Sequence, residues 1–179
     1  MVRMAVETAQ NMIVGFQQPY QDEDLSRYLS RFSEDIHWYD HAFRICRVGR
    51  TAISGLRTAW LLCNQPFDAK IKVDHVPLPS SELHKADRNP KSIEATSDGA
   101  IAEVVWHGRT TNDIIRPDGQ IAVKATGKDF VCHVCMLFKI NGDNEITRID
   151  EYYNKQWDDG IDENQYHVMK GQSLQEEKT

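Results

Sequence analysis

The sequence lacks any run of apolar residues that approaches the ~18 needed to cross a membrane as a helix. It also lacks a block of basic residues, because its 21 lysines and arginines are scattered among 27 aspartates and glutamates. With a formal net charge of −6, the chain is poorly suited to follow a phosphate backbone, so we expect neither a nucleic acid nor a membrane as partner. The stretch Met1-Val2-Arg3-Met4 has no signal-peptide core, and we therefore expect a cytoplasmic protein.

Cysteine is scarce, and the four cysteines follow no disulfide or metal pattern. They lie mainly in apolar stretches, which is typical of reduced core thiols rather than of a small disulfide scaffold. Cys132 and Cys135 have CxxC spacing, but they sit in an apolar run with no second ligand pair at zinc-finger spacing. We therefore expect no metal site and no cofactor.

The length of 179 residues predicts one domain, which we place at residues 1–160. Beyond Trp157 the chain is polar, so residues 161–179 are expected to form a partly disordered extension. A core of ~120 to 150 residues buries roughly two thirds of its unfolded surface. Such a core is stable without disulfides and is large enough to enclose a small cavity.

Hydrophobic periodicity predicts helices first and strands afterwards. Apolar residues at helical spacing indicate helices at 6–18, at 22–32 and at 51–62, the last ending before Asn64-Gln65-Pro66. Alternating or β-branched segments then predict strands at 70–76, 92–96, 100–110, 128–140 and 145–153, with a long polar excursion near 77–90. This order favours an α+β fold in which helices pack on one face of a curved, mainly antiparallel sheet. Such a sheet forms a cone whose mouth suits an apolar ligand.

A short aromatic strand near Ser33 to His41 carries the first candidate catalytic group. Asp40 shares a face with Trp38, because alternate residues of a strand point the same way. If that face closes into a pocket, Asp40 becomes a useful general base. If the face meets water, Asp40 is an ordinary turn residue. The segment from Phe43 to Val48 is predicted to return as the hairpin partner of this strand, with Gly49 at the following bend.

With this order of elements, several segments resemble the NTF2-like superfamily and its SnoaL-like group of polyketide cyclases and isomerases, of the fungal natural-product type. The resemblance covers most of residues 25–157. It rests on the opening stretch through Asp40, on Arg47 to Ile53, on Trp106-His107-Gly108, on Thr126-Gly127-Lys128 and on Phe138 to Tyr153. It implies an NTF2-like cone with the helices packed in a curved sheet.

A more distant resemblance, to ketosteroid isomerase, runs without a gap from about Phe16 to Arg57. It places Asp40 on that family's catalytic base. It also places Phe16 and Met136 on the two groups that donate hydrogen bonds to the oxyanion. Neither side chain has a proton to donate, so the ketosteroid reaction itself is not expected.

The same overlay implies a hydrophobic cavity with few charged groups. It assigns catalytic roles to Asp40, Glu151 and Arg57, although Glu151 could instead face solvent and Arg57 could form a purely structural ion pair. Ile149 and Tyr153 share a strand face with Glu151, which favours an inward Glu151. The implied substrate contacts are Trp38, Trp106, Tyr153, Met136, Phe16, His41, Cys132 and Ile149, with His41 at the mouth of the pocket.

The resemblance implies a cofactor-independent isomerase or cyclase acting on a small hydrophobic substrate of polyketide or terpenoid type. One carboxylate would remove a proton, the other would donate one, and Arg57 would hold developing negative charge. Two alternatives remain open, a non-catalytic NTF2-like binding module and a dehydratase or epoxide hydrolase of the same fold. A homodimer formed through the outer face of the sheet is also implied.

Overall fold

The computed structural model of the chain describes residues 2–17, 22–71, 93–115 and 119–154. Three helices, α1 (Val2–Phe16), α2 (Asp22–Leu29) and α3 (Arg50–Cys63), are found where periodicity predicts them. The strands are β1 (Phe32–Asp40), β2 (Ile45–Val48), β3 (Asn64–Ile71), β4 (Ile93–Ala95), β5 (Gly99–Thr110), β6 (Ile114–Ile115), β7 (Ile121–Val123), β8 (Asp129–Ile140) and β9 (Ile146–Tyr153).

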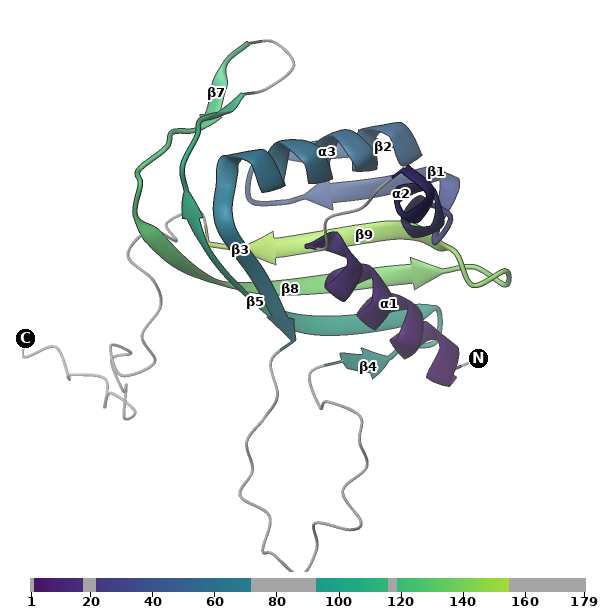
Figure 1. Cartoon of the computed structure of the whole chain (residues 1–179). Helices are drawn as coiled ribbons and strands as arrows, with labels where there is room; N and C mark the ends of the chain where they lie inside the picture. The colour runs from purple at the N-terminus through teal and green to yellow at the C-terminus, as the bar shows by residue number, and fades with distance from the viewer. Residues whose placement is uncertain (1, 18–21, 72–92, 116–118, 155–179) are drawn as a thin grey trace, which may run out of the picture.

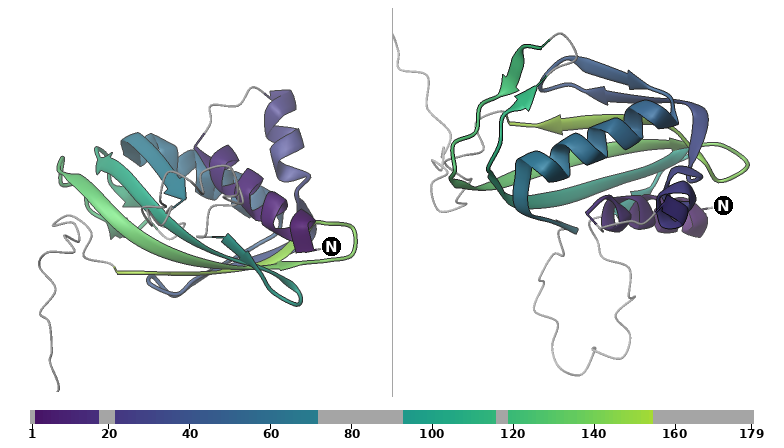
Figure 2. Two further views of the ribbon diagram at one scale, coloured as in Figure 1. Left: turned by 90° about the horizontal axis from the view of Figure 1, so that it is seen from below. Right: turned by 45° about the horizontal axis from the view of Figure 1, so that its top comes forward.

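The main sheet has the strand order β2-β1-β9-β8-β5-β3, and β4 also pairs with β5. β1 and β9 run parallel, and the other pairs of this sheet are antiparallel. The sheet curls strongly, with α1 and α3 lying against its concave side (Figures 1 and 2). β6 and β7 form a separate two-stranded hairpin that projects beyond one end of α3 (Figure 1). The α+β cone expected from the sequence is thereby confirmed.

Alternation along the long strands builds the core. On β8 every second side chain, from Phe130 through Phe138, is buried under the helices. β5 presents Val104 and Trp106 in the same way, and α1 contributes the helical face that begins at Val6 and ends at Phe16. Truncating a buried aromatic such as Phe130 to alanine should cost roughly 3–5 kcal/mol of unfolding free energy. Through Phe16 and Trp106, this packed layer also forms part of the wall of a cavity.

Gly49 sets the position of α3 over β1. Its φ of 84° lies in the region that favours glycine, and its backbone N–H donates to the carbonyl of Ile36 over 2.8 Å. A side chain at this position would strain the backbone. The predicted bend is thus also a hydrogen-bonded link between the strand that carries Asp40 and the helix that follows.

The segment after α3 differs from the prediction. The helix ends before Asn64 as predicted, but the next strand, expected only from residue 70, already begins at Asn64, directly after the helix. The buried Asn64 side chain donates to the Trp60 carbonyl and accepts from the Thr110 hydroxyl, so it links the end of α3 to β5. Most of the strand expected at 70–76, the polar excursion near 77–90 and the extension at 161–179 lie outside the described residues. Within the described residues, no helix is both long and apolar enough to span a bilayer.

Candidate active site

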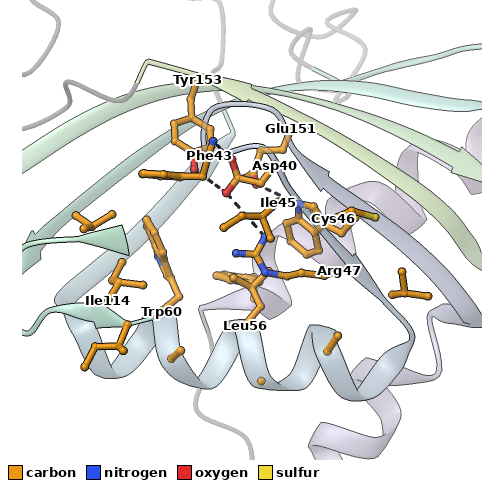
Figure 3. A pocket seen from close by; sticks show the side chains of 18 of the residues that line it. Asp40, Phe43, Ile45, Cys46, Arg47, Leu56, Trp60, Ile114, Glu151 and Tyr153 are labelled. Atoms are coloured by element: carbon orange, nitrogen blue, oxygen red, sulfur yellow. Dashed lines mark hydrogen bonds and ion pairs between the residues drawn. The ribbon is translucent and has the colours of Figure 1, made fainter. Parts of the chain in front are cut away.

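A cavity of about 550 Å³ lies between α3, the β1–β2 hairpin and the ends of β5 and β9. Ile114, Ile115 and Val123 of the β6–β7 hairpin line one side of it. Its wall is mainly apolar and aromatic (Figure 3), and its charged members are Asp40, Arg47 and Glu151. The aromatic side chains in the wall are Phe16, Trp38, Phe43, Trp60, Trp106 and Tyr153.

Asp40 and Glu151 lie directly opposite each other in the parallel register of β1 and β9. Both side chains therefore point to the concave face, where they are only 5% and 3% exposed. Glu151 lies inward, as strand alternation predicts. Two carboxyl groups buried side by side are uncommon, since each one penalises the ionisation of the other.

Asp40 is held by three neighbours that stabilise a negative charge. Its Oδ2 accepts a hydrogen bond from the Tyr153 hydroxyl at 2.9 Å and lies 3.8 Å from Nη1 of Arg47. Its Oδ1 accepts from the backbone N–H of Phe43 at 3.0 Å, a turn contact three residues along the chain. Asp40 is therefore a turn residue and a cavity residue at once, so the two alternatives drawn from the sequence do not exclude each other.

Glu151 holds its proton in this setting. Burial, together with the nearby negative charge of Asp40, raises the pKa of Glu151 to about 8. The hydrogen bond from Trp38 Nε1 to Oε2, 3.0 Å long, and the positive charge of Arg47 offset only part of this effect. Oε1 has no hydrogen-bond partner in the described part of the chain. At neutral pH Glu151 is therefore mostly a neutral acid that can donate a proton.

Tyr153 connects Asp40 to the aromatic wall of the cavity. Burial and the neighbouring carboxyl groups raise the pKa of Tyr153, so the phenol keeps its proton and donates to Asp40. Its ring lies 5.6 Å from that of Trp106 and 6.1 Å from that of Phe43. The hydroxyl orients Asp40 while the ring limits the space beside it.

The other predicted contact residues fall into two groups. Phe16, Trp38, Trp106 and Tyr153 line the cavity. Met136 does not, and lies instead in a small adjoining pocket that it shares with Phe16, Trp38 and Trp106.

Cys132 and Ile149 lie in the core and are not among the residues that line this cavity. Their contact with substrate stays a prediction. Burial also raises the pKa of the Cys132 thiol to about 12, which makes it a poor nucleophile at neutral pH.

The placement predicted for Arg57 is wrong. Arg57 is buried on α3 with its guanidinium 5.8 Å from the centre of the Tyr28 ring, and it does not line the cavity. Arg47 of β2 lies beside Asp40 instead. The antiparallel register pairs Arg47 with Trp38, which places both side chains on one face. This placement follows from the register of the β1–β2 hairpin, which the sequence alone leaves open.

His41 is also misplaced by the prediction. It follows Asp40 and therefore points to the opposite, convex face of the sheet. There its Nε2 lies 2.9 Å from Oδ1 of Asp150, and its ring stacks on Tyr152 at 4.3 Å. Adjacency in sequence to a cavity residue does not place a strand residue in the cavity.

The site as a whole combines a carboxyl group held by three donors, a second carboxyl group that keeps its proton, and a mainly apolar wall. A base and an acid within one such cavity can move protons on a hydrophobic molecule at neutral pH. In the part of the chain that the structure describes, no group of three or more His, Cys, Asp or Glu side chains is arranged to hold a metal ion.

No protein-family sequence profile matches this chain, and no curated protein is significantly similar to it in sequence. Its structure is nevertheless similar to many solved structures. One is a proposed SnoaL-like polyketide cyclase from Jannaschia sp. CCS1, with a TM-score of 0.60, 10% identity, and coverage of 85% of this chain and 86% of that one. Another is a protein from Catenulispora acidiphila with a ketosteroid isomerase-like fold, crystallised with trimethylamine. Its TM-score is 0.59 and its identity 16%, with coverage of 85% of this chain and 88% of that one.

A third similar structure is AclR from Streptomyces galilaeus, described as a proposed hydroxylase, with a TM-score of 0.57 and 14% identity over 87% of this chain and 82% of that one. Structures described only as NTF2-like are also similar to this chain. At these identities the similarity shows the fold alone. The chain therefore has the NTF2-like cone fold, which other proteins use with different proposed chemistries.

Proposed function

We propose that this protein is a cofactor-independent isomerase or cyclase that moves protons on a small hydrophobic molecule. The observation that carries the proposal is the buried pair of Asp40 and Glu151, one stabilised as an anion and the other holding its proton. A structural pair of carboxyl groups has no need of an apolar cavity of about 550 Å³ beside it. The descriptions of some of the similar structures as proposed polyketide cyclases support the same class of reaction.

In the proposed reaction, Asp40 removes a proton from a carbon next to an electron-withdrawing group of the substrate. The electron pair of the broken C–H bond forms a new C=C bond, and Glu151 protonates the oxygen that gains charge. Isomerisation follows when the proton on Asp40 returns to a different carbon. Cyclisation follows when the new nucleophilic carbon attacks a second carbonyl within the same molecule.

Glu151 supplies the donor that Phe16 and Met136 lack. The resemblance to ketosteroid isomerase places two oxyanion donors at positions that are apolar in this chain. Glu151 provides an acidic proton from β9, where it lies between Asp40 of β1 and Met136 of β8 in the strand register. Base and acid are thus carried by neighbouring strands. Polyketide- or terpenoid-like skeletons are the substrates that we propose for this cavity, because its lining is aromatic and aliphatic.

The proposal is tested with 2-tetralone, a neutral bicyclic ketone with acidic protons beside its carbonyl. Hydrogen exchange at those carbons in heavy water is followed by NMR at mildly acidic pH, where the buffer reaction is slow. We expect the protein to accelerate exchange by about 10²–10⁴ over buffer, the usual contribution of general acid–base catalysis. Asp40→Asn should remove this acceleration and Glu151→Gln should reduce it strongly.

Matched controls are available for both substitutions. Asp35→Asn changes an exposed carboxylate on the same strand as Asp40, and Glu94→Gln changes an exposed carboxylate on β4. Both should exchange 2-tetralone at the wild-type rate. Exchange at the buffer rate by the wild-type protein, or full activity of Asp40→Asn, would contradict the proposal. In that case binding without exchange would favour a non-catalytic ligand-binding module.

We also propose that two copies associate through the convex face of the sheet. Three large side chains on that face, Ile101, Leu137 and Tyr152, are 38%, 36% and 45% exposed. Exposed apolar groups on one continuous sheet face are typical of an interface with a protein. The stacked rings of His41 and Tyr152 extend the same surface toward β1.

A further inference from the structure

Arg47 lines the cavity and carries a buried donor whose hydrogen bond is unsatisfied among the described residues. Its side chain is 20% exposed overall, yet Nη1 is buried and has no hydrogen-bond acceptor among the described residues. The distance of 3.8 Å from Nη1 to Asp40 Oδ2 is an ion-pair contact and too long for a hydrogen bond. Figure 3 shows the guanidinium reaching from β2 into the space between Asp40 and Leu56.

A second donor without an acceptor lies nearby. Oε1 of Glu151 has no partner in the described ranges, and the raised pKa of Glu151 leaves a proton on that carboxyl group. A buried donor without an acceptor costs free energy, which a ligand recovers if it brings the acceptor. Arg47 and Glu151 thus both line the cavity and carry unsatisfied polar atoms, whereas Tyr153 and the Phe43 N–H already donate to Asp40. An oxygen acceptor on a ligand is the group that suits these donors.

The charged groups of the cavity determine whether a ligand's oxygen acceptor is neutral or anionic. The Asp40 carboxylate balances the Arg47 guanidinium, and Glu151 is neutral when it holds its proton. A neutral acceptor leaves the enclosure neutral. A carboxylate or phosphate group would add an unbalanced negative charge close to Asp40, which is unfavourable in an apolar cavity.

We propose that Arg47 binds the carbonyl oxygen of a neutral, largely apolar substrate and so determines the substrate class as a ketone or ester rather than a carboxylic acid. The inference rests on the function proposed above and gives Arg47 a direct contact with the reacting group. It also accounts for an arginine that the apolar wall would otherwise bury at a cost.

The same contact has a role during proton transfer. When Asp40 takes a proton from the carbon beside the carbonyl, Asp40 becomes neutral and the carbonyl oxygen gains the negative charge. The C–H bond breaks, an O–H bond forms on Asp40, and the C–C bond becomes a C=C bond. Arg47 thus has an anionic neighbour before and after the step, and the Glu151 proton is available to neutralise the oxygen.

The experiment measures affinity and needs no turnover. Calorimetric titration compares 2-tetralone with tetralin, which lacks only the carbonyl oxygen, and with tetralin-2-carboxylate, which carries a charge. We expect the wild-type protein to bind 2-tetralone about 10-fold more tightly than tetralin, as for one recovered hydrogen bond to a charged donor. Tetralin-2-carboxylate should bind more weakly than 2-tetralone.

Arg47→Met should bring the affinities for 2-tetralone and tetralin close together while leaving that for tetralin unchanged. Arg47→Lys should retain part of the preference, because it keeps one charged donor. Arg109→Met, which removes an exposed arginine paired with Asp129 on the surface, serves as the control and should bind like wild type. Thermal unfolding confirms that each variant is folded before it is titrated.

A preference for the ketone that persists in folded Arg47→Met overturns the proposal, as does tightest binding of the carboxylate by the wild-type protein. These results are independent of proton exchange. If the ketone preference depends on Arg47 but no exchange occurs, the binding assignment stands and the proposed catalysis fails. If exchange occurs but Arg47→Met keeps the preference for the ketone, the proposed catalysis stands and the binding role of Arg47 fails.

Discussion

Glu151 lies directly opposite Asp40 across the parallel pair of β1 and β9, and the charge on Asp40 helps to keep a proton on Glu151. The two carboxyl groups therefore have different protonation states although their strands place them on the same face of the sheet. This separation is what acid–base chemistry at neutral pH requires of two similar groups. It depends on Tyr153 and Arg47 on one side and on burial beside Trp38 on the other.

The stability of the protein should fall as pH rises from about 4.5 to about 8. Below the ordinary carboxyl pKa of 4.5, Glu151 is protonated in both the folded and the unfolded chain. Between 4.5 and about 8 only the unfolded chain has ionised, so it gains free energy relative to the folded state. The full difference corresponds to at most roughly 5 kcal/mol.

Urea unfolding of wild type and Glu151→Gln across this pH range measures the effect. The glutamine variant has no proton to lose at this position, so its advantage over wild type should grow with pH and level off above about 8. A constant difference between the two proteins across the range would contradict a raised pKa for Glu151.

Trp38→Phe should raise the pKa of Glu151 further. The indole N–H donates to Glu151 Oε2, which favours the charged form and lowers the pKa of Glu151. When this hydrogen bond is removed, burial and the charge of Asp40 raise that pKa with less compensation. Losing one such bond, worth about 1–2 kcal/mol, corresponds to about one pH unit. The pH at which 2-tetralone exchange falls should move upward by that amount. Trp106→Phe, which alters the cavity wall elsewhere, should leave this pH unchanged.

Arg57→Met should affect stability and leave the chemistry intact. Arg57 is buried against the Tyr28 ring and is not among the residues lining the cavity. Loss of its buried contacts should cost about 1–3 kcal/mol of unfolding free energy. The exchange rate per folded molecule should stay at the wild-type value. A large fall in that rate, with the fold preserved, would restore the catalytic role that the sequence suggested for Arg57.

Tyr153→Phe should slow proton exchange without abolishing it. The variant keeps the ring but removes the hydrogen bond to Asp40 Oδ2, which holds that oxygen in position at 2.9 Å. A loss of about 10-fold in rate is expected for one such bond. The rate of 2-tetralone exchange, measured with Asp40→Asn as the inactive reference, checks this. An unchanged rate would show that Tyr153 does not position the base.

The proposed dimer is tested by light scattering. Wild type should have twice the chain mass of 20.6 kDa, while Leu137→Lys and Tyr152→Lys should weaken the association. Leu62→Lys, which adds the same charge at an exposed leucine of α3, should leave the mass unchanged. A wild-type monomer at high concentration would contradict the proposal.

Much of the fold follows from the sequence because local periodicity and tertiary packing agree. The helices and the long β5, β8 and β9 strands carry clear apolar patterns, and each lies within a few residues of its predicted place. The way in which α3 ends was harder to predict from the sequence. There Asn64, a residue typical of loops, is buried and hydrogen-bonded to Trp60 and Thr110, a contact made only in the folded chain.

The positions of site residues could be predicted wherever the alternation of side chains along a single strand decides which face they occupy. Counting by two places Asp40 with Trp38 and Glu151 with Tyr153, and the structure has all four side chains at the cavity. The same count puts His41 outside. Arg47 was missed because its place depends on the register of the β1–β2 hairpin, which sequence alone leaves open. The catalytic roles of Asp40 and Glu151 stay predictions.

The proton on Glu151 can be followed directly by a carbon-13 NMR titration of its side-chain carboxyl carbon, assigned by the absence of that signal in Glu151→Gln. This carboxyl group should titrate with a midpoint near pH 8, so that it is mostly protonated at neutral pH in the cavity beside Asp40. A midpoint near the ordinary value of 4.5 would show that both carboxyl groups are ionised, and would contradict the assignment of Glu151 as the acid.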